Sequence, residues 1–240
     1  MRGQIIALGG GGFSSESSPV LDDYILQQTG KDMPKICFLP TASGDADSYI
    51  VRFYAAFSSR HCRPVHLSLF RPPTSDLESF LLDCDVIYVG CGNARNMLAV
   101  WKEWKIDKYL QRAWENRVML CGAGAGAICW FTQGLAESYP GTLAKMDGLK
   151  LLPGSVAPHY DGEWQRRPTF HEMIGNGTLA GGYGVDDGVA LHFFGTELYR
   201  VVSSRPKATA YRVSAENRAA VEQPLKSYFL EETSALAEGE

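Results

Sequence analysis

The chain has 240 residues, a formal net charge of −4 and a pI near 5.8. This length is enough to bury one sizeable core, so one domain is expected. The acidic balance and the lack of a Lys/Arg-rich run exclude a polyanion-binding surface, and nucleic acid is therefore not an expected partner. No segment has the apolar length of a signal peptide or a membrane span, so we predict a cytoplasmic protein without a membrane partner.

Short apolar runs alternate with helical patterns in the first two thirds of the chain. This alternation is typical of an α/β fold with a mainly parallel, doubly wound sheet and helices on both faces. The predicted strands cover residues 4–8, 35–39, 63–70, 85–89 and 118–121. The predicted helices cover residues 19–28, 45–60 and 76–82.

The pattern of apolar residues changes after about residue 148 to short β-like runs separated by turn residues. These runs cover residues 188–193, 197–202, 208–213 and 227–230. They are expected to form an antiparallel C-terminal extension of the same sheet. We predict a single domain over residues 1–230 and a frayed acidic tail over residues 231–240.

The sequence predicts neither a metal site nor a cofactor. Its histidines lack metal-ligand spacing such as H-E-x-x-H, and the glycine run at residues 9–12 does not complete a dinucleotide-binding motif because residue 14 is serine. Six cysteines without CxxC spacing fall mostly in apolar runs, where reduced core packing is the expectation. They are Cys37, Cys62, Cys84, Cys91, Cys121 and Cys129.

Residues 118–130 read VMLCGAGAGAICW, an apolar strand that passes through a small-residue turn into a helix. Glycines at 122, 124 and 126 give the frame of a nucleophile elbow, G-x-S-x-G, in which a strand-to-helix turn projects the attacking side chain into a crevice. The central position is Gly124, so the hydroxyl is missing. A second glycine-rich turn at residues 89–97 follows a neighbouring predicted strand, and such turns converge on one crevice in doubly wound sheets.

Six segments together resemble the peptidase E and cyanophycinase family of serine peptidases, whose fold is like that of class I glutamine amidotransferases. The resemblance covers nearly the whole chain. Its landmarks are the elbow at 118–130 and the segments LGGGGF at 8–13, FLPTAS at 38–43, YVGCGN at 88–93, APHYD at 157–161 and VDDGV at 185–189.

The resemblance implies a catalytic triad with its nucleophile at position 124. Carried over by position, His159 is the base, and Asp187 is the acid that orients it, with Asp186 as the competing choice. The implied oxyanion donors are the backbone N–H of Ala125 and one from Gly90, Cys91 or Gly92. The predicted substrate-binding residues are Asn93, Tyr160, Arg166 and Arg167.

The chain departs from the family pattern most sharply at Gly124, which stands where the family has serine. Without a nucleophile, catalysis by the acyl-enzyme route is expected to fall roughly a thousandfold or more below that of an intact triad. Cys91, in a turn that is usually all glycine, is a substitute thiol to weigh, but we expect a loop cysteine not to inherit the geometry of the elbow.

Two functions remain open at this point. The first is a peptidase E-like serine peptidase of short peptides, such as dipeptides, that is inactive in this chain because of Gly124. The alternative is a non-catalytic pseudoenzyme that binds a peptide or an amino acid in the same crevice. In both, the expected partner is a short peptide, and the resemblance is compatible with a homodimer.

Overall fold

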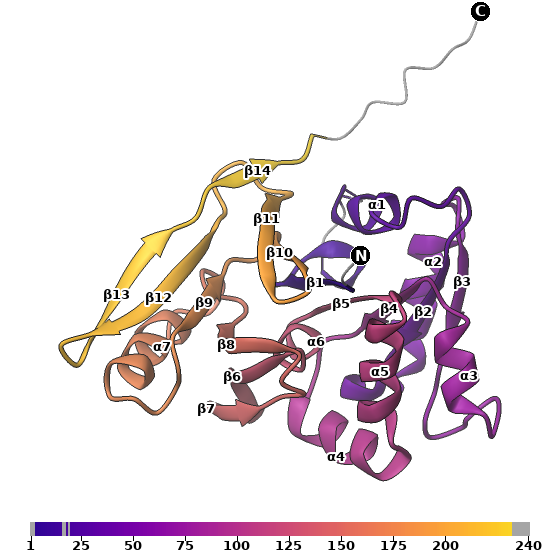
Figure 1. Cartoon of the computed structure of the whole chain (residues 1–240), viewed down its shortest axis with the longest axis horizontal. Helices are drawn as coiled ribbons and strands as arrows, with labels where there is room; N and C mark the ends of the chain where they lie inside the picture. Colours follow the sequence, from indigo (N-terminus) through magenta and orange to yellow (C-terminus); the bar gives the residue numbers. More distant parts are fainter. Residues whose placement is uncertain (1–2, 16–17, 19, 232–240) are drawn as a thin grey trace, which may run out of the picture.

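The computed structural model describes residues 3–15, 18 and 20–231. Its larger sheet has eight strands in the order β14-β11-β10-β1-β5-β4-β2-β3 (Figure 1). The five strands from β1 to β3 in this order are parallel, whereas β10 runs antiparallel to β1, and β11 runs antiparallel to β10. The strands are β1 (Gln4–Leu8), β2 (Lys35–Leu39), β3 (Arg63–His66), β4 (Val86–Val89), β5 (Met119–Ala123), β10 (Val189–Phe194), β11 (Glu197–Ser203) and β14 (Ser227–Phe229).

Helices cover both faces of this sheet, because successive side chains of a buried strand point to opposite faces. In β1, Ile5 and Ala7 belong to one apolar cluster, and Ile6 and Leu8 belong to another. The first cluster includes residues of α3 (Leu77–Leu82), α4 (Ala94–Trp104) and α5 (Ile106–Glu115), and the second includes residues of α1 (Val20–Gln27) and α2 (Asp47–Phe57). The doubly wound α/β class predicted from the sequence is confirmed.

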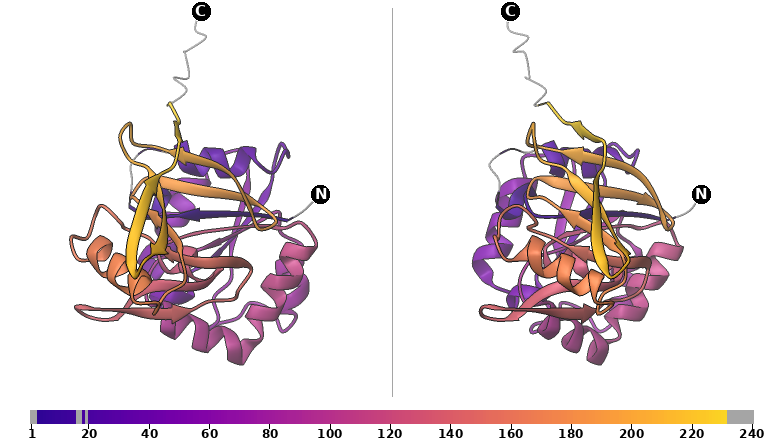
Figure 2. Two further views of the ribbon diagram at one scale, coloured as in Figure 1. Left: turned by 60° about the vertical axis from the view of Figure 1, so that its left-hand side comes forward. Right: turned by 90° about the vertical axis from the view of Figure 1, so that its left-hand side faces the viewer.

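A second sheet of six strands has the order β13-β12-β9-β8-β6-β7 and is drawn in salmon to yellow beside the larger sheet (Figures 1 and 2). Helix α7 (Arg166–Gly175) packs on β12 and β13 of this sheet. The strands are β6 (Phe131–Tyr139), β7 (Thr142–Asp147), β8 (Leu152–Ala157), β9 (Gly182–Val185), β12 (Ala210–Glu216) and β13 (Ala219–Pro224).

The second sheet corrects the prediction that all the C-terminal strands extend one sheet. Strands β10 and β11 do extend the larger sheet in antiparallel fashion, but β12 pairs with β9 and β13 in the second sheet. Strand β14 returns to the larger sheet, parallel to β11. A hydrophobic pattern predicts that a strand exists but does not specify its partner.

The other predicted elements match the observed ones closely, and β1 and β2 have the predicted bounds. Strand β3 ends at His66, whereas the prediction ran to residue 70. The chain leaves the sheet there because Asp45 Oδ2 accepts bonds from the N–H groups of Leu69 (2.7 Å) and Phe70 (3.1 Å). The predicted helix start at residue 19 and the predicted tail from residue 232 onward lie outside the described residues. Within the described ranges, no helix has the length and apolar character needed to cross a bilayer.

Candidate active site

The site lies where the carboxyl ends of β1, β4 and β5 meet. Because these strands are parallel, their C-terminal ends share one edge of the sheet, which is where doubly wound folds place their ligands. The segment after β8 joins this edge, since His159 N–H donates to Gly9 O at 3.0 Å. The first and fifth strands are also tied together, because Gly124 N–H donates to Leu8 O at 3.4 Å.

Gly124 keeps the backbone of a nucleophile elbow. Its φ of 57° and ψ of −111° lie in a region that side chains with a Cβ rarely adopt, and the short helix α6 (Ala125–Ile128) follows at once. The N–H groups of Ala127 and Ile128 both donate to Gly124 O at 3.0 Å and close the turn. A serine nucleophile would hold this conformation at a strain of about 1–3 kcal/mol, which glycine does not incur.

His159 and Asp187, the predicted base and acid, are hydrogen-bonded to each other. His159 Nδ1 lies 2.6 Å from Asp187 Oδ1, and His159 itself has a positive φ of 55°. Asp187 is fixed by its own N–H, which donates to Asp161 Oδ1 at 2.8 Å. Arg205 donates both to Asp161 Oδ2 (3.0 Å) and to the carbonyl oxygen of Asp187 (2.9 Å). The imidazole therefore presents its other nitrogen, Nε2, to the crevice.

Asp186, the competing choice for the acid, points elsewhere. Its carboxylate is buried and accepts a bond from Thr209 N–H at 3.0 Å. Burial raises the pKa of Asp186, whereas the hydrogen bond from His159 lowers the pKa of Asp187. An ionised carboxylate beside imidazole is what stabilises an imidazolium, and Asp187 is the group in that position.

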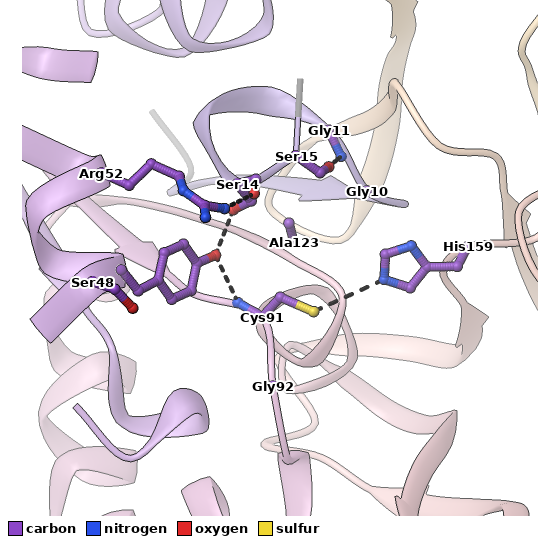
Figure 3. Close-up of a pocket in the computed structure, with 11 residues that line it drawn as sticks. Gly10, Gly11, Ser14, Ser15, Ser48, Arg52, Cys91, Gly92, Ala123 and His159 are labelled. Carbon is purple, nitrogen blue, oxygen red and sulfur yellow. Dashed lines mark hydrogen bonds between the residues drawn. The ribbon is translucent and has the colours of Figure 1, made fainter. Parts of the chain in front are cut away.

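Cys91 occupies the space in front of the base. Its Sγ lies 3.9 Å from His159 Nε2, and its N–H donates to Tyr49 Oη at 3.1 Å (Figure 3). A Cβ built at position 124 would lie 3.1 Å from His159 Nε2 and would overlap Cys91 Sγ. The thiol of this loop cysteine therefore fills the space that a side chain at position 124 would need.

Cys91 and His159 each shift the pKa of the other in the direction that favours its charged form. Burial acts to lower the pKa of His159, but the hydrogen bond to Asp187 and the adjacent Cys91 outweigh it and raise the pKa from 6.5 to about 9. Burial likewise acts to raise the pKa of the Cys91 thiol, but His159 and the N–H groups of Ala125 and Gly92 lower it. The pair is thus biased towards thiolate and imidazolium, the arrangement that activates cysteine as a nucleophile.

Only some of the predicted oxyanion donors are available. Gly90 N–H donates to Leu39 O at 3.1 Å, and Cys91 N–H is held by Tyr49, so neither points into the crevice as a free donor. The N–H groups of Gly92 and Ala125 instead act on the Cys91 thiol, whose pKa they lower. Of the three alternatives for the second donor, Gly92 is the one that remains beside Ala125.

Two cavities flank Cys91 and His159, and both residues line each of them. The larger, about 330 Å³, is mainly apolar and is lined further by Tyr49 and by Arg52, which Figure 3 labels. The smaller, about 180 Å³, lies over the elbow and is lined further by Glu137, Glu163 and Arg166. Their sizes suit a small extended ligand that crosses the thiol and the imidazole.

Of the four predicted substrate-binding residues, Arg166 alone lines a cavity at the site. It is buried, and it donates to Glu163 Oε2 at 2.7 Å and to Leu135 O at 3.0 Å. Asn93 caps α4 by accepting from Asn96 N–H, and its amide donates to Ser138 O at 3.0 Å.

Tyr160 and Arg167 both point away from the crevice. Tyr160 is buried, and its hydroxyl donates to Glu222 Oε2 at 2.6 Å. Arg167 donates to the same carboxylate and stacks on the rings of Tyr160 and Tyr211. These contacts correct the prediction that the two side chains bind substrate, because their polar groups are engaged in the second sheet.

Two contributors to the site escaped the sequence analysis. A Cβ at Gly10 would overlap Asp187 Oδ1 and lie 2.8 Å from His159 Nδ1, so glycine is required there for the pair to form. Tyr49 comes from α2 and holds the backbone of Cys91. The glycine run at residues 9–12 was a signal for the first, whereas nothing in the local sequence of α2 signals the second. Among the described residues, no cluster of three potential metal ligands occurs.

The fold and the site define a hydrolase-type α/β protein with an elbow after β5. The model of peptidase family S51 matches residues 5–201, and the chain belongs to this family. A relative in Bacillus subtilis (strain 168), described as the uncharacterized peptidase YgaJ, is 54% identical over 228 residues, which are 95% of this chain and 99% of that protein. Membership of this family supports a peptidase-like function.

Two crystal structures are similar in fold. One is a peptidase from an acI-B1 actinobacterium, with a TM-score of 0.74, 16% identity and coverage of 95% of both chains. The other is a putative peptidase E protein from Listeria monocytogenes EGD-e, with a TM-score of 0.60, 16% identity and coverage of 94% of this chain and 100% of that one. Both likenesses agree with the predicted glutamine amidotransferase-like fold.

Proposed function

We propose that this chain hydrolyses short peptides in the crevice at the ends of β1, β4 and β5, by a route that does not use a serine at position 124. The observation that carries the proposal is the pair of His159 and Asp187, joined at 2.6 Å with Nε2 turned to the crevice. An imidazole held in one orientation by a carboxylate is the general base of acyl-transfer enzymes.

The surroundings of His159 and Asp187 favour a role in hydrolysis over a purely structural ion pair. The N–H groups of Gly92 and Ala125 lower the pKa of the adjacent Cys91 thiol, and they are the donors that remain for a developing oxyanion. The two flanking cavities are too small for a folded domain and suit one or two residues on each side of a cleaved bond. Short peptides are therefore the substrate class.

A non-catalytic peptide-binding function is the second candidate. Gly124 favours it, because the position of the family's nucleophile carries no oxygen. Both candidates use the same crevice, so they differ in turnover and not in binding.

The test follows amine release from a panel of dipeptides and tripeptides. The unmodified protein should release amine, and His159→Gln should lower kcat/KM by roughly a thousandfold or more. His171→Gln is the matched control, since His171 bonds to Glu222 at 2.9 Å outside the crevice, and it should leave turnover unchanged. Peptide binding by calorimetry without any turnover would favour the second candidate and contradict the first.

A further inference from the structure

We propose that Cys91 is the nucleophile of this chain, so that the attacking atom has moved from the elbow to the facing loop. This inference rests on the proposed function of peptide hydrolysis. In this account the two departures from the family pattern are linked: the cysteine at position 91 replaces the serine lost at position 124, and its thiol lies where a Cβ at 124 would have to be.

The geometry gives Cys91 the partners that a nucleophile needs. Its Sγ faces His159 Nε2 at 3.9 Å, and His159 Nδ1 bonds to Asp187 at 2.6 Å, so sulfur, imidazole and carboxylate lie in one chain of contacts. A distance of 3.9 Å is long for a bond to sulfur, but such contacts shorten when substrate binds. Tyr49 fixes the loop through the N–H of Cys91.

Cys91 also differs from the other cysteines in access. All six are free thiols, and five of them are buried, whereas Cys91 is partly exposed and lines both cavities of the site. A cysteine that served only to pack the core would be buried, as the other five are. A peptide that spans them must pass directly over the sulfur.

The reaction balances without any further reactant than water. The thiolate attacks the peptide carbonyl carbon, and the electron pair of the C=O bond moves to oxygen. The tetrahedral intermediate collapses and breaks the C–N bond, and the leaving amine takes the proton from His159 Nε2. Water, deprotonated by the same nitrogen, then hydrolyses the thioester and releases the acid and the thiolate.

The charged groups around the sulfur shape its titration. His159 faces it directly, with Asp187 behind the imidazole. The phenol of Tyr49 approaches from α2, and the flanking cavities add Arg52 on one side and Arg166, Glu137 and Glu163 on the other. Alkylation by iodoacetamide should therefore fall by much less between pH 9 and pH 6 than the roughly two hundredfold loss of an ordinary thiol. His159→Gln should restore the steep loss.

The decisive experiment combines turnover with detection of the acyl group. Cys91→Ala should lower peptide kcat/KM by roughly a thousandfold or more, and the matched cysteine control Cys62→Ala, in the core between α2 and β3, should not. p-Nitrophenyl acetate should give a burst of nitrophenol and an acetyl adduct that mass spectrometry maps to Cys91.

A paired exchange tests the compensation itself. Gly124→Ser alone should gain no serine-dependent turnover, because its Cβ overlaps the sulfur. Gly124→Ser combined with Cys91→Gly should give turnover that iodoacetamide no longer inhibits.

The outcomes separate the two proposals. Full peptide turnover by Cys91→Ala would overturn the inference and leave the proposed function standing. If the unmodified protein hydrolyses no peptide, the proposed function fails, and the acetyl burst alone decides the nucleophile: an adduct on Cys91 supports it, and no adduct or one elsewhere overturns it.

Discussion

Asp187→Asn should destabilise the folded protein by an amount that depends on pH. The rise in the pKa of His159 from 6.5 to about 9 corresponds to roughly 3 kcal/mol of preference for the imidazolium in the folded state. Cys91 supplies part of that preference, so removal of the Asp187 charge should cost about 2 kcal/mol at pH 6. At high pH the imidazole is neutral, and only its hydrogen bond to the carboxylate of Asp187 remains, which contributes less than the ion pair does.

The sign follows from the direction of each shift. His159 has a higher pKa folded than unfolded, so its contribution is complete below 6.5 and is lost as the pH rises through about 9. Asp187 has a lowered pKa, so its contribution is present above its unfolded value of 3.8 and is lost as the pH falls below it. The difference between the native protein and the variant is therefore largest near pH 6 and smallest near pH 10.

Urea unfolding at pH 6 and at pH 10 measures this difference. Asp186→Asn is the matched control, because Asp186 bonds to Thr209 N–H and not to an imidazole, so its cost should not change between these pH values. A cost of Asp187→Asn that stays constant from pH 6 to pH 10 would refute the ion pair.

Three further substitutions test the placement of individual groups. Gly10→Ala puts a Cβ against Asp187 and 2.8 Å from His159 Nδ1, so peptide kcat/KM should fall at least ~1000-fold, whereas Gly177→Ala, in open space, should retain it. Tyr160→Phe removes the bond to Glu222 and should lower the free energy of unfolding by about 1–2 kcal/mol without changing KM. A severalfold rise in KM would instead show that Tyr160 contacts the substrate. Gly92 has a φ of 144°, and the Cβ of Gly92→Ala would overlap Ala42 O. The substitution should therefore displace the loop that carries Cys91 and lower peptide turnover, and a thermal melt of the same variant measures its stability.

Much of the larger sheet could be predicted from the sequence, because its strands are short apolar runs with both faces buried. Strands β1 and β2 have the predicted bounds for this reason. The second sheet could not be predicted, since it depends on pairings between segments far apart in the chain, such as β9 with β12. Propensity and periodicity are local signals, and the partner of a strand is a tertiary choice.

The predicted site residues divide in a similar way. His159 and Asp187 came from motif position, and the structure brings them together at 2.6 Å. Tyr160 lies in the same motif as His159, and Arg167 lies shortly after it, but both side chains bond to Glu222 of the second sheet, because neighbours in sequence after a strand need not point the same way. The access of Cys91 could not be foreseen, since it depends on the empty space at Gly124.

The most direct test of the account is to locate the acyl group on the protein during turnover. The unmodified chain is mixed with a p-nitrophenyl ester of a blocked amino acid, quenched in acid within the burst and mapped by proteolysis and mass spectrometry. The account predicts a thioester on Cys91 that is absent in His159→Gln. An acyl group on another residue, or none while the ester is consumed, would contradict it.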